Sequence, residues 1–320
     1  MFDLPPNLAQ AIEDCVERFP AGDVEREVGD LVSRYRASDE VTRHPLATPL
    51  SAAAYAAYRM PGTFAGLSAV FSRVQAAMPG FAPRSMVDLG SGTGAAAWAG
   101  LAAWPELDTV TLVDQAHPAL ELGRQLAENG PTPLVAARCQ QSDAAEGMPR
   151  ADLAVAGYLL GELEPGGREA LVAAMLAAAS VSVFVEPGTP AGYRRILDVR
   201  DSLLSAGWTV AAPCPHGLPC PLPSDDWCHF AARFARSPRL RRLKRAEHGY
   251  EDEKYSYVVG TRLEITPTLG RIIRHPQKRT GLVLLEVCEA DGTAATVPVS
   301  KRRGSLYRSA RDARWGDPWP

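Results

Sequence analysis

The sequence has no hydrophobic run long enough to cross a membrane. Its longest apolar run, from Leu171 to Val185, is interrupted by Ser180 and Ser182, and a transmembrane helix needs about 20 consecutive apolar residues. The first residues, M-F-D-L-P-P, also lack the basic and apolar regions of a secretory signal peptide. We therefore expect a cytoplasmic protein, a monomer with no membrane partner.

Lysine is scarce, and charge is unevenly distributed along the chain. Residues 1–204 hold 15 basic and 25 acidic residues, a net charge of −10, and contain no lysine. Residues 205–320 hold 19 basic and 12 acidic residues, a net charge of +7, and include all four lysines. A basic C-terminal third on an acidic body indicates an anionic partner for that third.

The six cysteines are few, and a reducing compartment disfavours disulfide bonds between them. Clustered cysteines in such a protein are more often metal ligands. Cys15 and Cys139 are far from the other four in sequence, and we expect both to pack as small hydrophobic side chains.

The periodicity of apolar residues changes near residue 85. Residues 7 to about 80 show apolar side chains at helical spacing, whereas short apolar or β-branched runs alternate with helical stretches afterwards. Such alternation predicts an α/β fold, a mostly parallel sheet with helices on both faces. The expected strands are residues 85–89, 109–113, 134–138, 152–158, 181–186, 208–212 and 255–261.

Three regions follow from these patterns. Residues 1–80 form a helical N-terminal arm, and residues 81–262 form the α/β domain, interrupted by a cysteine-rich insert over 213–250. Five prolines within residues 213–223 exclude a helix or central strand there. Residues 263–320 form a small basic β extension and tail, with a hairpin signal at Asp291-Gly292.

A glycine-rich segment, V-D-L-G-S-G-T-G over residues 87–94, follows an expected strand and opens an expected helix. The glycines permit a tight turn and close approach of a ligand, and the helix N-terminus offers free N–H groups. Asp114 ends the next strand, where a carboxylate can accept hydrogen bonds from ribose hydroxyls. Taken alone, the loop could also be only a tight turn of an α/β sheet.

The G-x-G-x-G spacing after Asp88 resembles motif I of the class I S-adenosylmethionine-dependent methyltransferases. That resemblance implies a Rossmann-like, seven-stranded sheet whose glycine loop passes the methionine part of the cofactor. It also implies that Asp114 holds the ribose, that Ser142 and Asp143 contact the adenine, and that Tyr158 borders the methyl group. The S-adenosylmethionine-binding candidates are Asp88, Gly90, Ser91, Gly92, Gly94, Asp114, Ser142, Asp143 and Tyr158.

Three cysteines in the proline-rich insert have the spacing Cys-x5-Cys-x7-Cys, and Cys288 follows in a later apolar run. Thiolates held by a stiff loop can ligate iron or zinc. Four cysteines suit a 4Fe–4S cluster or a zinc site about equally, because the spacing fits no standard motif. His216 or His229 could replace Cys288 in a zinc site, although isolated loop histidines are usually solvated.

Four further motifs lie in the last third of the chain: C-P-H-G at 214–217, W-C-H-F at 227–230, E-K-Y-S-Y at 253–257 and the segment from 307 to 317. Together with the methyltransferase motif they resemble one family, the methyltransferase-like proteins associated with the mitochondrial ribosomal small subunit and their bacterial relatives. The resemblance spans nearly the whole chain. It implies a 4Fe–4S cluster, with zinc as the alternative, on four cysteines that match Cys214, Cys220, Cys228 and Cys288.

Basic residues concentrate in three stretches of the C-terminal third. Arginine binds phosphate through its planar fork, and interleaved Phe234, His275, Tyr307 and Trp315 could stack on unpaired bases. Most charge runs are solvated surface, but three runs on an otherwise acidic chain favour RNA. The resemblance implies ribosomal small-subunit rRNA as partner. The RNA-binding candidates are Arg239, Arg241, Arg242, Lys244, Arg245, Lys278, Arg279, Lys301, Arg302 and Arg303.

The sequence assigns no catalytic residue. After the fourth expected strand the chain has G-Y-L-L-G-E instead of the N/D-P-P-Y/F tetrapeptide of amino-group methylation, and no cysteine nucleophile lies near strands four or five. Glu162 and Glu186 are the remaining acid–base candidates. An rRNA methyltransferase, a non-catalytic small-subunit assembly or translation factor and a zinc-containing RNA-binding protein therefore all stay open.

Overall fold

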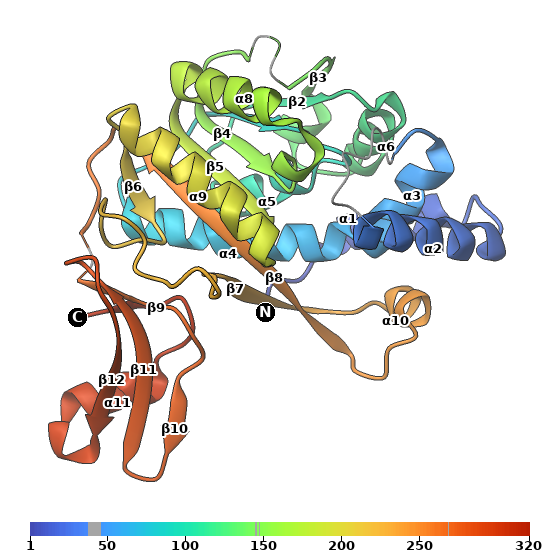
Figure 1. Ribbon diagram of the computed structural model, residues 1–320. Coiled ribbons are helices and arrows are strands. Elements are labelled where there is room, and N and C mark those ends of the chain that lie inside the picture. Colours follow the sequence, from blue (N-terminus) through green and yellow to red (C-terminus); the bar gives the residue numbers. More distant parts are fainter. Residues whose placement is uncertain (38–45, 145, 147, 268) are drawn as a thin grey trace.

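A computed structural model describes residues 1–37, 46–144, 146, 148–267 and 269–320 (Figure 1). Its helices are α1 (Pro6–Val16), α2 (Ala21–Ala37), α3 (Pro49–Tyr58), α4 (Met60–Ala77), α5 (Ala95–Ala103), α6 (His117–Ala127), α7 (Thr132–Val135), η1 (Leu160–Glu162), α8 (Pro165–Ala178), α9 (Pro190–Ser205), α10 (Pro238–Lys244), η2 (Lys301–Arg303) and α11 (Ser305–Asp312). None of these helices is long and apolar enough to span a membrane.

The strands divide between a large sheet and a small one. The large sheet contains β1 (Ser85–Leu89), β2 (Thr109–Asp114), β3 (Arg138–Gln141), β4 (Ala151–Gly157), β5 (Ala179–Pro187), β6 (Thr209–Ala212), β7 (Phe230–Ala235) and β8 (Tyr250–Thr261). The small sheet contains β9 (Gly270–Ile272), β10 (Gln277–Arg279), β11 (Leu282–Glu289), β12 (Ala294–Ser300) and β13 (Pro318–Trp319).

The large sheet has the strand order β3-β2-β1-β4-β5-β8-β6, with β7 beside β8. The first five strands run parallel, and β8 pairs antiparallel with β5, β6 and β7. β6 pairs with the C-terminal part of β8, and β7 pairs with its N-terminal part. The α/β fold of class I methyltransferases, with its mixed sheet and helical N-terminal region, is confirmed.

Both faces of the large sheet are buried, which explains its nearly continuous apolar strands. Along β4, Leu153 and Val155 pack with α4 and α5, whereas Ala154 and Ala156 pack with α8 and α9 on the other face. The period of two is the geometry of a strand between two helical layers. The helices therefore cover the sheet as expected from the sequence.

Two local predictions are wrong. Residues 134–138 were expected as a strand, but Leu134 and Val135 end the short helix α7, and β3 begins at Arg138. A short apolar run fits either element, so periodicity alone could not separate them. A seven-stranded sheet was expected, but residues 230–235 of the insert form a further strand, β7, which makes the sheet eight-stranded over the described residues.

The N-terminal helices are joined to the sheet by an ion pair whose carboxylate is buried and whose guanidinium is partly exposed. Arg59, between α3 and α4, donates from Nη1 and Nη2 to the two carboxylate oxygens of Glu253 on β8, at 3.3 and 3.1 Å. Gly62 leaves room for that carboxylate, because a Cβ there would lie 2.7 Å from Glu253 Oε2. One turn further, a Cβ at Gly66 would lie 2.7 Å from the Tyr158 hydroxyl. The two glycines form a notch on α4 that accepts both side chains.

The small sheet lies below the large sheet and its helices in Figure 1, and α11 packs against it. Its strand order is β10-β11-β9-β13, and β12 pairs antiparallel with β11 from Leu282 to Cys288. Ile272, Leu285 and Trp319 belong to its own apolar core. This sheet is therefore stabilised largely by its own side chains and joins the body through polar contacts described below.

Replacing Arg59 by Ala should destabilise the protein by about 3–5 kcal/mol, because the buried Glu253 carboxylate would lose its partner. Chemical denaturation measures the free energy of unfolding. Arg233→Ala is the matched control, because Arg233 pairs with Asp252 on the exposed side of the same strand pair; it should cost less than about 1 kcal/mol. Equal losses in the two variants would contradict this account of the buried pair.

Candidate functional site

The glycine loop after β1 has the backbone that the sequence predicts. Gly90, Gly92 and Gly94 have φ angles of 65°, 52° and 85°, a region that favours glycine. The Gly92 N–H donates to Asp114 Oδ2 at 2.7 Å, and the Ala116 N–H donates to Asp114 Oδ1 at 2.8 Å. Asp114 at the end of β2 therefore closes the loop at the carboxyl ends of the parallel strands. This is where the cofactor was predicted to bind, and it is called the cofactor edge below.

Asp88, the last but one residue of β1, is buried at the same edge. Burial and the neighbouring Asp114 carboxylate raise its pKa to about 8, while a hydrogen bond from the Ala97 backbone opposes them. Asp88 Oδ2 and the Ser91 hydroxyl are buried without a partner among the described residues. Buried polar atoms are rarely left unpaired, so these two atoms mark a place where a ligand could supply hydrogen bonds.

Glu162 brings a third carboxyl group to this edge, at the end of η1. Burial is the main cause that raises its pKa to about 8, and repulsion from the Asp114 and Glu186 carboxylates adds to it. Tyr55 of α3 closes the opposite side, since a Cβ at Gly92 would lie 3.9 Å from the Tyr55 ring. Three carboxyl groups gathered at one edge favour a cationic ligand.

The two residues expected at the adenine lie at the end of β3, beside Asp114. The Ser142 N–H donates to the Asp114 carbonyl oxygen at 3.2 Å, and Ser142 Oγ accepts from Gln140 Nε2 at 2.9 Å. Asp143 Oδ2 accepts from Gln115 Nε2 at 2.9 Å. The structure thus brings the candidate residues after β1, β2 and β3 to one edge.

Tyr158 follows β4 with a φ angle of 62°, which is unusual for a residue other than glycine. Its ring lies beneath the Arg59 guanidinium, 5.7 Å from the ring centroid, and burial raises its pKa well above the ordinary tyrosine value. Backbone strain of this kind is common at functional sites. Tyr158 therefore borders both the cofactor edge and the Arg59–Glu253 pair.

Glu186, by contrast, has a structural role. Its side chain is 0% exposed, Oε1 accepts from the Leu160 N–H at 3.0 Å, and Oε2 accepts from Arg195 Nε at 2.6 Å. These contacts fix η1 between β5 and α9. Of the two acid–base candidates, Glu162 is the one whose carboxyl group is not held in this way.

The four candidate metal ligands converge in space. Cys214, Cys220, Cys228 and Cys288 all line one apolar cavity between α9, β8 and the small sheet. The described residues contain no group of three or more side chains already positioned as metal ligands. The cysteines thus share a cavity without forming a closed coordination shell in this structure.

Two buried arginines line the same cavity. Arg200 of α9, 2% exposed, donates to the His216 carbonyl oxygen at 3.1 Å and to the Leu218 carbonyl oxygen. Arg271 of β9 donates to the carbonyl oxygens of Pro213 and Gly316, at 2.9 and 3.0 Å. These arginines hold the cysteine loop from two sides and leave positive charge beside the thiols.

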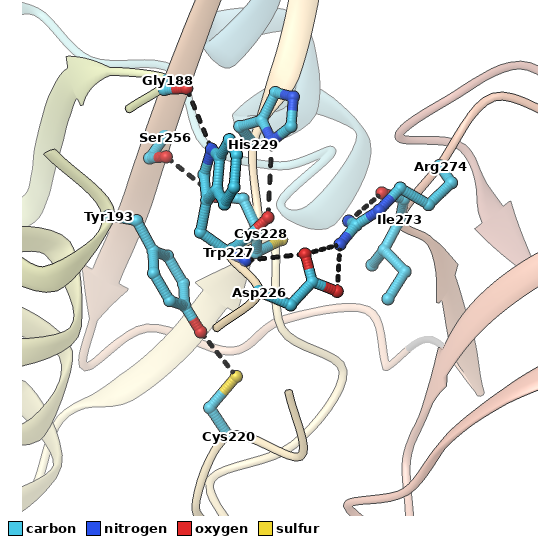
Figure 2. A network of polar contacts seen from close by, with 10 residues as sticks. All are labelled: Gly188, Tyr193, Cys220, Asp226, Trp227, Cys228, His229, Ser256, Ile273 and Arg274. Atoms are coloured by element: carbon cyan, nitrogen blue, oxygen red, sulfur yellow. Dashed lines mark hydrogen bonds and ion pairs between the residues drawn. The ribbon is translucent and has the colours of Figure 1, made fainter. Parts of the chain in front are cut away.

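Polar contacts also hold the loop on its other side (Figure 2). The Trp227 indole N–H donates to the Gly188 carbonyl oxygen at 3.0 Å, and the Ser256 hydroxyl donates to the Cys228 carbonyl oxygen at 2.8 Å. Asp226 accepts from Arg274 through both carboxylate oxygens, which ties the loop to the small sheet.

Burial raises the pKa of three of these thiols: well above the ordinary value for Cys228, to about 12 for Cys288, and upward for Cys214. Repulsion between neighbouring cysteines adds to the effect, and Arg200 opposes it at Cys214 and Cys288. Thiols of this kind stay protonated until a metal ion replaces the protons.

The histidines differ in their relation to the cavity. His216 Nε2 lies 3.4 Å from Cys288 Sγ, and His216 Nδ1 is buried without a partner among the described residues. His229 instead stacks on Trp227 and contacts Trp315, with ring centroids 5.4 and 4.9 Å apart. Only His216 is placed where it could replace or support Cys288.

The basic candidates differ in how far their charge is neutralised. Arg239 pairs with Glu13 of α1, and Lys244 pairs with Glu251 and covers the Tyr58 ring. The exposed Arg242 and Arg245 have no acidic partner in the described ranges, and Arg241 donates only to the Glu247 carbonyl oxygen. The predicted stretch is therefore only partly free to bind an anion.

The other basic candidates gather at one end of the small sheet. Lys278 and Arg279 of β10 are exposed beside the turn at Gly281, whose carbonyl oxygen accepts from the Lys301 N–H at 2.8 Å. Lys301, Arg302 and Arg303 form η2 there, also exposed. No acidic partner is present for these five side chains within the described part of the chain.

The aromatic residues expected to stack on bases are mostly packing residues. Phe234 is fully buried, and Trp315 packs among His229, Phe230 and His275. The sequence interpretation also missed the buried Arg200 and Arg271. Arg200 could have been found, because it follows Ile196 and precedes Leu203 at the spacing of the buried face of α9.

Curated relatives share the sequence over much of the chain. Human "Ribosome assembly protein METTL17, mitochondrial" is 31% identical over 287 residues, which cover 83% of this chain and 62% of that protein. "Rsm22-cox11 tandem protein 2, mitochondrial" of Schizosaccharomyces pombe is 31% identical over 181 residues, 43% of this chain and 24% of that protein. The chain thus matches less than two thirds of the length of either relative.

Similar solved structures include the magnesium protoporphyrin IX methyltransferase ChlM of Synechocystis with bound SAH, with 11% identity, a TM-score of 0.42 and coverage of 63% of this chain and 84% of that one. Another is the precorrin-6y C5,15-methyltransferase of Geobacter metallireducens, with 13% identity, a TM-score of 0.39 and coverage of 61% and 84%. These scores are too low to carry over a ligand or a reaction.

A profile described as "Mitochondrial small ribosomal subunit Rsm22" matches residues 49–320. This description and the mitochondrial relatives contradict the expected cytoplasmic location. That expectation was wrong because targeting signals are read by receptors, and the composition of a folded body does not reveal its compartment. The family predicted from the cysteine and C-terminal motifs is confirmed, and the chain belongs to the Rsm22 family of the mitochondrial small ribosomal subunit.

Proposed function

We propose that this chain binds S-adenosylmethionine at the carboxyl edge of its large sheet, carries a 4Fe–4S cluster in the cysteine cavity, and acts on RNA of the small ribosomal subunit during assembly. The observation that carries the proposal is the convergence of four cysteines and two buried arginines on one cavity. Family membership and the human relative, whose name describes a ribosome assembly protein, support the ribosomal part.

The cofactor edge fits S-adenosylmethionine by its chemistry. That cofactor carries a sulfonium and an ammonium group. These positive charges would favour ionisation of Asp88 and Glu162 beside Asp114, because both carboxyl groups have a pKa of about 8 without a ligand. The unpaired Asp88 Oδ2 and Ser91 hydroxyl can bond with the ligand. We therefore assign the methionine part to the loop, the ribose to Asp114, and the adenine to the neighbourhood of Ser142 and Asp143.

The cysteine cavity fits an anionic cluster better than a neutral group. A 4Fe–4S cluster would act as an electron carrier or a structural link between the loop and the small sheet. Four thiolates bring negative charge into an apolar cavity, and Arg200 and Arg271 supply compensating positive charge there. Zinc bound by three cysteines and His216 is the alternative.

Methyl transfer is the second candidate function. Glu162 favours it, because its carboxyl group lies at the cofactor edge near Asp114 and has a pKa of about 8, suited to moving a proton. The structural use of Glu186 leaves few other groups for catalysis. Transfer of labelled methyl from S-adenosylmethionine to small-subunit RNA by the wild-type protein, and its loss in Glu162→Gln, would establish an enzyme. Cofactor binding without transfer would establish an assembly factor.

Replacing Asp114 by Ala should weaken S-adenosylmethionine binding by about 10- to 100-fold, since a charge-assisted hydrogen bond to the ligand is lost. Isothermal titration calorimetry measures the dissociation constant. Asp108→Ala is the matched control, because Asp108 precedes the other end of β2 and pairs with the exposed Arg84. Unchanged affinity in Asp114→Ala, or an equal loss in Asp108→Ala, would refute the assignment.

The raised pKa of Asp88 predicts a pH dependence of stability without cofactor. Its carboxyl group is protonated in the folded protein up to a pKa of about 8 but ionises near 4 when unfolded. The stability it contributes is therefore present below pH 4 and is lost as the pH rises toward 8. Asp88→Asn should melt about 2–4 °C higher than wild type at pH 9. A difference in melting temperature that does not grow from pH 5 to 9 would contradict this prediction.

Protein purified without oxygen should contain about four irons per chain and absorb broadly in the visible range. Cys214→Ser should lose both iron and colour, because one of the four thiolates is removed. Cys139→Ser is the matched control, since Cys139 is an exposed residue of β3 and does not pack as the small hydrophobic side chain that the sequence predicted. One zinc without colour would replace the cluster by a zinc site. Wild-type protein without metal would leave the cavity as packing only.

A further inference from the structure

The hairpin formed by β7, α10 and the first half of β8 projects beyond the large sheet (Figure 1). The last pair between β5 and β8 joins Pro187 to Tyr255, so residues 250–254 of β8 pair with β7 alone. Because β8 runs antiparallel to β5, these residues extend past the carboxyl edge that carries the glycine loop. The hairpin tip therefore lies on the cofactor side of the sheet.

The two faces of this hairpin carry different kinds of side chain. Side chains alternate along a strand, so Phe234, Glu251 and Glu253 face the body, where Phe234 and Glu253 are buried. The outer face carries His248, Tyr250 and Asp252 from one chain segment and Arg233 from β7. These outer side chains are exposed.

Three of the outer side chains form a stack. The Arg233 guanidinium lies 4.2 Å from the centroid of the Tyr250 ring, and Asp252 fixes that guanidinium through two hydrogen bonds of 2.7 Å. The His248 and Tyr250 rings are 5.7 Å apart and within 19° of parallel. Ala235 is the direct cross-strand neighbour of Tyr250, and its small side chain leaves the ring 42% exposed.

The charge beside this stack comes from α10 and its end. Arg241, Arg242 and Arg245 are exposed there, and none has an acidic side chain as partner among the described residues. The other basic side chains of the hairpin, Arg236, Arg239 and Lys244, pair with carboxylates. A flat aromatic stack, on the same hairpin as three guanidinium groups without acidic partners, offers both surfaces that a single-stranded nucleic acid needs, one for bases and one for phosphates.

We infer that the hairpin tip binds single-stranded RNA, with an unpaired base stacked on the Tyr250–His248 surface and its phosphates on Arg241, Arg242 and Arg245. A duplex keeps its bases stacked inside and cannot use Tyr250 in this way. This inference rests on the proposed RNA function and names the contact through which the chain holds RNA near its cofactor edge. It requires neither methyl transfer nor a particular metal in the cysteine cavity.

The test compares wild type, Tyr250→Ala and Tyr250→Phe, using the full chain and two labelled probes. One probe is an oligouridine of about twelve nucleotides, within the range that single-strand-binding domains cover, and the other is a blunt RNA duplex of the same length. Fluorescence anisotropy gives the affinities. Tyr250→Ala should weaken binding of the oligouridine about 5- to 100-fold and leave the duplex unchanged. Tyr250→Phe keeps the ring and should bind like wild type.

A second variant separates charge from stacking. Arg241→Ala with Arg242→Ala should lower the slope of log affinity against log salt by about 1.4, because two phosphate contacts disappear. Tyr250→Ala should leave that slope unchanged, since stacking releases no counterions. A wild-type slope in the double variant would overturn the phosphate contacts.

Two results would overturn the stacking role: equal oligouridine binding by wild type and Tyr250→Ala, or equal weakening by Tyr250→Ala and Tyr250→Phe. Preference of the wild-type protein for the duplex would overturn the single-strand assignment while leaving RNA binding intact. Metal content, cofactor affinity and association with isolated small subunits are measured on the same proteins. Absence of metal, of cofactor binding and of association with small subunits in the wild-type protein would instead refute the proposed function.

Discussion

The antiparallel pairing of β8 with β5 is the constraint on which the candidate sites depend. Seven residue pairs, from Tyr255 with Pro187 to Thr261 with Val181, fix the position of β8. Three side chains of β8 then serve three different places. Tyr257 lines the cysteine cavity, Glu253 binds Arg59 beside the cofactor edge, and Tyr250 contacts Arg233 near the hairpin tip. A slip of one residue would turn each side chain to the opposite face.

The two candidate cofactor sites have opposite electrostatic character although the same sheet supports both. Buried carboxyl groups surround the glycine loop, and their repulsion is relieved by protons or by a cationic ligand. Buried guanidinium groups of Arg200 and Arg271 line the cysteine cavity, where anionic ligands relieve the cost of burying them. The charge at each site is therefore not balanced by protein side chains alone. Each site favours a ligand whose charge is opposite to that of its buried groups.

Sequence patterns predicted the strands of the large sheet well because burial on both faces produces apolar runs that are bounded by glycine and polar turns. They failed at α7, where Leu134 and Val135 fit either element, and at β7, whose alternation F-A-A-R-F-A lies among basic residues. Cys214, Cys220 and Cys228 were singled out by their local spacing, and Cys288 was added only through the family resemblance. Pairs such as Arg239 with Glu13 could not be found, because partners more than 200 residues apart meet only in the folded chain.

The length of β8 separates the proposed RNA-binding tip of the hairpin from the cofactor edge. At about 3.3 Å per residue, the five steps from Tyr255 to Tyr250 place the hairpin tip about 17 Å beyond the last pair that β8 makes with β5. A nucleotide stacked on Tyr250 cannot also occupy the cofactor edge. If the hairpin binds RNA as proposed, recognition at its tip and any reaction at the cofactor edge would involve different nucleotides of one strand, and the length of the hairpin would set the distance between them.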